Sequence, residues 1–205
     1  MISTTGSLAG TFTVECWALT RKPKGTDTIL CSRGPKDFGF NIKFRQGKRF
    51  HADIGDGSRW LSKMANAKFS YNRNIWYHIA YVVTPADYTV YVNGDSWAQG
   101  RMDLQGLPLL YDPDHQLWLG ADAIDGDPLD GEIAEVRIWS TARTGEQIRS
   151  TLNSTLSGNE QGLQACWRFE EVTGVTAKDQ SGHGFLATLS GDCSWSTNGP
   201  SIVRR

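Results

Sequence analysis

Alternation of polar and apolar side chains is the clearest pattern in the chain, and it organises residues 130–139. In this segment the polar Glu135 and Arg137 alternate with the apolar Val136 and Ile138. A repeat of two residues is typical of a β-strand with one buried and one solvated face. We therefore predict a half-buried strand here.

The period changes directly after this strand. Thr144 can cap a helix, and Gln147 three residues later completes a capping box. Ile148 and Leu152 then stand one helical turn apart. These features predict one short helix at residues 144–153.

Strand patterns recur through nearly the whole remaining chain. In residues 11–19, one face carries Phe12, Val14, Cys16 and Ala18. Comparable segments lie at residues 28–31, 38–44, 48–54, 75–83, 88–92, 117–119 and 162–171. In residues 38–44 and 48–54, the expected inward residues are Phe38, Phe40, Ile42, Phe44, Phe50, Ala52 and Ile54. Many short strands and one helix favour an all-β antiparallel sandwich.

Turn residues and tryptophans refine this picture. Gln46 with Gly47 predicts a hairpin turn, and Asn93 with Gly94 is the dipeptide most favoured in a two-residue turn. Five tryptophans fall within strand patterns and are expected in the core: Trp17, Trp76, Trp118, Trp139 and Trp167.

Composition is compatible with one domain over residues 1–205. The chain is 39% hydrophobic and 11% aromatic, enough to bury a substantial core. No stretch reaches the roughly 20 apolar residues of a membrane span, and the first residues lack a signal-peptide pattern. We expect a domain excised from a larger protein. Four cysteines allow three complete pairings, and Cys16 and Cys166 fit buried thiols.

Charge is unevenly distributed although the net charge is only -1. Up to Trp76 there are 13 basic and 5 acidic residues, whereas 8 basic and 17 acidic residues follow. The basic half could attract a sulfated polyanion, or it could form an ordinary solvated surface. Its candidate residues are Arg21, Lys22, Lys24, Arg33, Lys36, Lys43, Arg45, Lys48 and Arg49.

Two kinds of residue suggest a binding site. Asp122, Asp125 and Asp127 lie in a loop containing Gly and Pro, which could gather oxygen ligands around Ca²⁺. The alternative is a solvated acidic loop. Aromatic rings near loops could stack on sugars, with polar groups beside them. The expected sugar-binding residues are Trp97, Tyr111, Trp60, Arg101 and Asn93.

Catalysis has weaker support. Glu132 and Glu135 would point to opposite faces of a regular strand, so they could not flank one glycosidic bond as paired catalytic carboxylates do. His78 lies inside a strand pattern and is expected to be a satisfied structural histidine. No nucleophile elbow, phosphate loop or zinc-protease motif is present. We expect no enzymatic activity.

Seven segments in order resemble the laminin-G-like (LamG) domains of the concanavalin A-like lectin/glucanase superfamily. They are residues 12–17, 76–81, 91–94, 117–120, 131–139, 146–148 and 162–170. The resemblance implies a jelly roll of two curved antiparallel sheets. Members usually have one further strand before the segment that begins at Phe12. We expect that strand to be absent or replaced by residues 193–203, which would cover the exposed sheet edge.

The resemblance also bears on ligands. Calcium-dependent relatives, the pentraxins among them, take ligands from positions that resemble Asp122, Asp125 and Asp27. A turn at residues 179–184 is similar to one that is common in the family, and Asp179 is expected to act as a turn or capping residue.

We predict a non-catalytic, lectin-like carbohydrate-binding or adhesion module. Its ligand binding could depend on Ca²⁺. Its expected partner is a glycan or glycoprotein at an extracellular location or the cell surface, with no nucleic acid. The alternatives are a protein-interaction or structural module and, with less support, a glycoside hydrolase.

Overall fold

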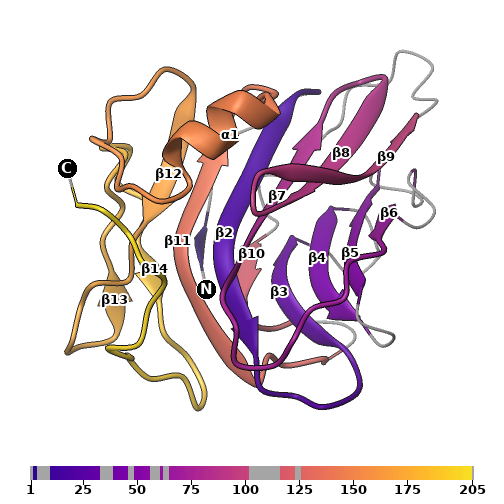
Figure 1. Ribbon diagram of the computed structural model, residues 1–205. Helices are drawn as coiled ribbons and strands as arrows, with labels where there is room; N and C mark the ends of the chain where they lie inside the picture. Colours follow the sequence, from indigo (N-terminus) through magenta and orange to yellow (C-terminus); the bar gives the residue numbers. More distant parts are fainter. Residues whose placement is uncertain are drawn as a thin grey trace.

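The computed structural model describes most of the 205 residues. The described residues are 2–3, 10–32, 39–45, 49–55, 61, 65–101, 116–122 and 126–204. Two antiparallel sheets stack face to face, and one short helix lies across the outer side of one of them (Figure 1).

One sheet has eight strands in the order β13-β14-β1-β10-β3-β4-β5-β6. Their bounds are β1 Ile2–Ser3, β3 Asp27–Ser32, β4 Phe40–Arg45, β5 Arg49–Ile54, β6 Ala65–Ala67, β10 Gln116–Leu119, β13 Thr176–Ala177 and β14 Ala187–Thr188. Strands distant in the sequence lie side by side in this order, as in a jelly roll.

The other sheet has six strands in the order β12-β11-β2-β7-β8-β9. Their bounds are β2 Phe12–Thr20, β7 Tyr77–Val83, β8 Asp87–Val92, β9 Asp95–Arg101, β11 Gly131–Trp139 and β12 Leu163–Trp167. The predicted all-β antiparallel jelly roll is therefore confirmed.

The core lies between the sheets and contains the side chains that the alternation placed there. Phe12, Val14, Cys16 and Ala18 of β2 are fully buried in it. They face Phe40, Ile42, Phe44, Phe50, Ala52 and Ile54 of β4 and β5. Phe38 and the turn at Gln46 and Gly47 lie outside the described residues. Asn93 and Gly94 both have positive φ, 51° and 85°, as the predicted turn requires.

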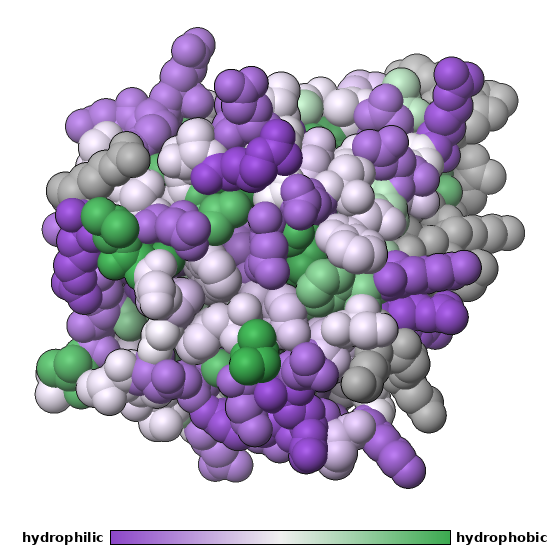
Figure 2. All heavy atoms as spheres, in the orientation of Figure 1, coloured by the Kyte–Doolittle hydropathy of each residue, from purple (hydrophilic) through white to green (hydrophobic). Residues whose placement is uncertain are grey.

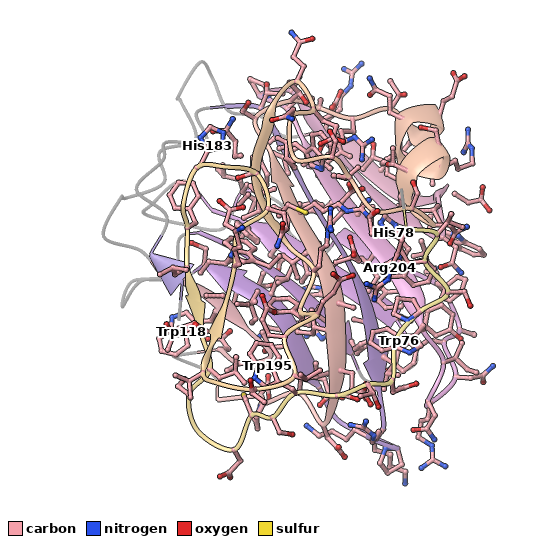
Figure 3. The ribbon with its side chains drawn as sticks, turned by 90° about the vertical axis from the view of Figure 1, so that its left-hand side faces the viewer. Trp76, His78, Trp118, His183, Trp195 and Arg204 are labelled. Atoms are coloured by element: carbon pink, nitrogen blue, oxygen red, sulfur yellow. The ribbon has the colours of Figure 1, made fainter. Side chains whose placement is uncertain are left out.

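Two of the five expected core tryptophans do not lie in the core. Trp17, Trp139 and Trp167 are buried, but Trp76 and Trp118 are only partly buried. Figure 3 shows the latter two on opposite sides of the sandwich. Trp118 lies between the inward-facing Leu117 and Leu119, so its side chain emerges on the outer face of the eight-stranded sheet.

The N-terminal strand is present, contrary to the sequence expectation. The short β1 pairs with β10 on one side and with β14 on the other. The C-terminal part of the chain covers this edge as expected, but through Ala187 of β14 and not through residues 193–203. Val203 instead bridges Ser154 beyond the helix.

Helix α1 (Gly145–Thr151) confirms the predicted short helix and its cap. The Thr144 hydroxyl accepts a hydrogen bond from Gln147 N, and the Gln147 side chain accepts one from Thr144 N. Ile148 packs on Ala80 and Val82 of β7. The helix therefore covers part of the outer face of the six-stranded sheet (Figure 1).

Buried polar side chains of that sheet hold the C-terminal end of α1. Trp17 Nε1 donates to Leu152 O at 2.8 Å, and Arg137 donates to Thr151 O at 3.1 Å and to Ser154 O at 2.7 Å. These donors satisfy carbonyls that have no partner within a helix. The fully buried Glu15 in turn accepts from Arg143 Nη1 at 2.6 Å and from Trp139 Nε1 at 2.9 Å.

Asp179 has the turn-stabilising role predicted for it. Its carboxylate accepts hydrogen bonds from the backbone amides of Cys166, Ser181 and Phe185 and from the Ser181 hydroxyl. The turn is thereby fixed against β12, and the carboxylate has a structural function.

Candidate functional site

Trp97 is an exposed indole held in a fixed position on the edge strand β9. Val90 pairs with Ala98 and Tyr91 with Ser96, so Trp97 is the extra residue of a β-bulge. The residue is 46% exposed, and its ring packs edge-on against Phe69, with the ring centroids 4.9 Å apart. Among the described phenylalanines, tyrosines and tryptophans, Trp97 alone is classed as exposed.

Polar side chains lie on the same strand. Gln99 Nε2 donates to Ser96 Oγ at 2.9 Å, and both residues are exposed. Arg101 is exposed at the end of β9, in register with Asp87 of β8. An apolar ring with hydrogen-bonding groups nearby is the chemistry that a sugar ring requires.

Asn93, expected to bind sugar, has a structural contact in the fold, and its ligand contact stays a prediction. Its Oδ1 accepts a hydrogen bond from His78 N at 2.9 Å, which fixes the turn between β8 and β9. Tyr111, Trp60 and Asp125 lie outside the described residues, so their predicted roles stay predictions.

The outer face of the eight-stranded sheet carries two polar rows that the site prediction did not include. The first row runs from Trp118 through Cys31 and Asn41 to Asp53. The second runs from Thr28 through Lys43 to His51, and His51 Nε2 lies 2.5 Å from Asp53 Oδ2.

The alternation that placed Ile42 and Ala52 in the core already implied that their neighbours face outward. Among the described residues, the buried Asn41 Oδ1 and Thr28 Oγ1 have no hydrogen-bond partner. Because both atoms are buried, they are not acceptors that this face exposes to solvent.

Three of the expected calcium ligands, Asp27, Asp122 and Asp127, lie next to lysine side chains. Lys43 Nζ lies 3.0 Å from Asp122 Oδ2 and 3.7 Å from Asp127 Oδ2. Lys22 Nζ lies 2.7 Å from Asp27 Oδ1. Ca²⁺ prefers six to eight oxygen ligands, and a neighbouring ammonium group opposes its binding. The described contacts thus fit two lysine-centred ion-pair sites better than a calcium site.

The same contacts account for part of the charge asymmetry. Arg21 and Lys43, from the basic half, pair with Glu132, Asp122 and Asp127 from the acidic half. These five residues therefore balance one another's charge within the fold. Lys24, Arg45 and Arg49 remain exposed, while Arg33, Lys36 and Lys48 lie outside the described residues.

The glutamates of β11 are occupied by structural contacts. Glu135 has φ 51° at a register shift between Ala134 and Arg137, so the regular alternation assumed from the sequence does not hold there. Its carboxylate lies 2.9 Å from Arg137 Nη2, and burial raises its pKa. Glu132 pairs with Arg21 and accepts hydrogen bonds from Asn198.

His78 is buried as predicted, but it is not hydrogen-bonded through its ring. Its Nε2 lies 3.6 Å from Glu15 Oε2, and among the described residues neither ring nitrogen has a hydrogen-bond partner. Burial lowers the pKa of His78 to about 4. With only 1% of the side chain exposed, this imidazole has a structural position under α1.

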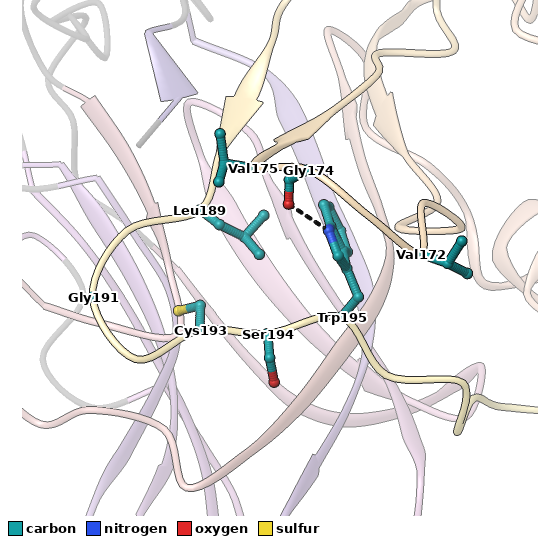
Figure 4. Close-up of a pocket in the computed structure, with 8 residues that line it drawn as sticks. All are labelled: Val172, Gly174, Val175, Leu189, Gly191, Cys193, Ser194 and Trp195. Atoms are coloured by element: carbon teal, nitrogen blue, oxygen red, sulfur yellow. Dashed lines mark hydrogen bonds between the residues drawn. The ribbon is translucent and has the colours of Figure 1, made fainter.

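A shallow hollow of about 430 Å³ lies in the C-terminal part of the chain (Figure 4). Its lining includes Val172, Val175, Leu189, Cys193 and Trp195, and Trp195 Nε1 donates to Gly174 O at 2.8 Å. Val172 and Val175 are 72% and 62% exposed. Figure 2 shows hydrophobic side chains as separate patches on a largely hydrophilic face.

Cys193 is an exposed thiol, whereas Cys16 and Cys166 are buried as expected.

Two stacked antiparallel sheets in jelly-roll order define a lectin-like β-sandwich. The family Laminin_G_3, described as the concanavalin A-like lectin/glucanases superfamily, matches residues 2–149. The chain therefore belongs to that superfamily. No curated protein matches the sequence.

Several solved structures share the fold at low sequence identity. A candidate carbohydrate-binding protein from Bacteroides ovatus has a TM-score of 0.69 and 19% identity over 97% of this chain and 58% of its own. This chain thus spans little more than half of that protein. The heptameric SAP-like pentraxin of Limulus polyphemus has a TM-score of 0.54 and 18% identity over 69% of each chain.

A third similar structure contains a bound sugar. Domain 4 of AbnA, an extracellular arabinanase of glycoside hydrolase family 43 from Geobacillus stearothermophilus, was solved with arabinotriose. Its TM-score is 0.55, with 21% identity over 69% of this chain and 66% of that one.

The described part of our chain contains no helix long and apolar enough to cross a membrane.

Proposed function

We propose that this chain is a non-catalytic carbohydrate-binding module of a larger extracellular or cell-surface protein. The observation that carries the proposal is the exposed indole of Trp97, which the bulge in β9 and the contact with Phe69 hold in place. A preformed ring platform binds sugar without the cost of ordering a side chain. The carbohydrate-binding descriptions of similar structures support this reading.

Each part of the proposed site has a separate task. The Trp97 ring stacks on the apolar face of a sugar, and Arg101 or the Ser96 and Gln99 pair supplies hydrogen bonds. The partly buried indole of Trp118, on the outer face of the eight-stranded sheet, is the second candidate contact for a glycan. Calcium at Asp122, Asp125, Asp127 and Asp27 stays a prediction that the lysine contacts do not favour.

A glycan array with the folded chain tests the proposal. Trp97→Ala should reduce binding by at least about fivefold, since loss of an aromatic anchor at a binding site costs about 1 kcal/mol or more. Ile75→Ala is the matched control, because Ile75 is an apolar side chain of similar exposure, 49% against 46%. Loss of binding in Trp118→Ala, with Trp97→Ala unaffected, would move the site to the outer face of the eight-stranded sheet.

A protein-interaction module is the second candidate function. The exposed Val172 and Val175 beside the C-terminal hollow favour it, because exposed apolar patches often mark contact surfaces. An array without any bound glycan, together with a partner whose binding is lost in Val175→Asp, would support this alternative. The exposed Arg45 and Arg49 could attract a sulfated polyanion, and such binding would weaken steeply with salt.

A further inference from the structure

Two lysine side chains stand where the acidic loops would otherwise need a cation. Lys22 Nζ lies 2.7 Å from Asp27 Oδ1, 3.0 Å from Thr26 O and 3.1 Å from Pro128 O. An ammonium group has three hydrogen-bond donors, and this cradle supplies three oxygen acceptors. Lys22 therefore joins the segment between β2 and β3 to the segment before β11.

Lys43 makes the matching connection from the middle of β4. Its side chain is 6% exposed and lies 3.0 Å from Asp122 Oδ2, which is fully buried. Asp127 Oδ2 lies 3.7 Å from the same nitrogen and is 39% exposed. Because an isolated buried carboxylate is strongly disfavoured, a fixed positive charge at this place stabilises the buried Asp122.

Backbone hydrogen bonds hold the described residues between β10 and β11, 120–122 and 126–130, against β2 and β3. Thr28 N donates to Asp127 O at 3.0 Å, and Arg21 N donates to Asp130 O at 2.7 Å. Within the segment, Gly126 N donates to Asp122 O at 3.0 Å. The lysine ion pairs and the backbone hydrogen bonds thus hold the same described residues of this segment.

We propose that the ammonium groups of Lys22 and Lys43 take the structural place of calcium in this chain. A divalent ion would have to displace or approach these ammonium groups, and the repulsion between the charges opposes that. The loops are therefore assembled without metal, and glycan binding is independent of calcium. Of these two statements, only the calcium independence of glycan binding rests on the proposed function.

Unfolding of the wild-type chain gives the first test. The melting temperature should be the same in excess CaCl₂ and in EDTA, and calorimetric titration with CaCl₂ alone should give no binding heat. A melting temperature that rises with CaCl₂ overturns the proposal, because a ligand of the folded state stabilises it by mass action.

Variants give the second test. Lys43→Met should lower the melting temperature by roughly 6–20 °C, because it removes the ammonium group that lies 3.0 Å from the buried Asp122 carboxylate. Lys43→Arg keeps the charge and should lose less. Lys24→Met, an exposed lysine next to the Lys22 cradle, is the matched control and should melt like the wild type. Equal melting temperatures for Lys43→Met and the control would overturn the proposal.

The outcomes separate this proposal from the proposed function. If Lys43→Met does not fold, Lys22→Met tests the more exposed cradle and should still lower the melting temperature. Glycan binding that survives EDTA supports both proposals, and binding that EDTA abolishes refutes the lysine proposal alone. If no glycan binds, the proposed function fails, while the melting measurements still decide the role of the lysines.

Discussion

Acidification should destabilise the fold through His78. The imidazole lies beneath α1 and faces Glu15 of β2, Arg137 of β11 and Arg143 of the following loop, with the Trp17 ring 5.5 Å away. Burial is the main cause that lowers its pKa, and the two arginines add to the effect, while Glu15 opposes it. The folded chain therefore holds this histidine in its neutral form.

The sign and size of the effect follow from proton binding. Unfolding returns the pKa from about 4 to 6.5, so between these values the unfolded state binds more protons. Stability is full above the unfolded pKa and falls as the pH decreases. Between pH 7 and pH 5 the loss from His78 amounts to about 2 kcal/mol. That is a large fraction of the roughly 5–15 kcal/mol that stabilises a typical domain.

Urea unfolding followed by tryptophan fluorescence at several pH values measures this loss. His78→Phe keeps an aromatic ring beside Trp17 but cannot bind a proton, so its stability should change less between pH 7 and pH 5. His183→Gln replaces an exposed histidine and should keep the wild-type pH dependence. If the wild type and His78→Phe lose stability in parallel over this range, the reasoning about the buried imidazole is refuted.

Three further substitutions test how the fold is held together. Glu15→Gln should lower the free energy of unfolding, measured by urea denaturation, by about 3–5 kcal/mol, because Arg143 loses the carboxylate that balances its buried charge. A loss below about 1 kcal/mol, within the range of a surface ion pair, would contradict this. Thr144→Ala should cost about 1 kcal/mol through loss of the helix cap, and Thr144→Ser should restore most of it. Gly158→Ala should greatly reduce the soluble yield, because Gly158 has φ +96° and a Cβ there would lie 2.0 Å from Gln180 O. Normal folding of Gly158→Ala would show that this backbone contact can relax.

The sequence predicts the sheets well because the alternation of side chains within each strand indicates which face is buried. In β2 and β5 every second residue is apolar, and these residues form the core. Local patterns fail where the structure depends on long-range pairing. The short β1 has too few residues to show a period, and Glu135 lies at a β-bulge in the pairing of β11 with β2. Trp118 looked like a core residue because tryptophan is apolar, although its neighbours Leu117 and Leu119 take the inward positions.

The candidate site was less predictable because charges act through space. The sequence identified Asp27, Asp122 and Asp127 as a possible cation site, but it could not show that Lys22 and Lys43 meet these carboxylates. A strand pattern indicates on which face a lysine lies, but it does not show that Lys43 of β4 lies next to Asp122 and Asp127. An acidic loop therefore indicates a need for positive charge, and only the tertiary fold decides whether a metal or the chain itself supplies it.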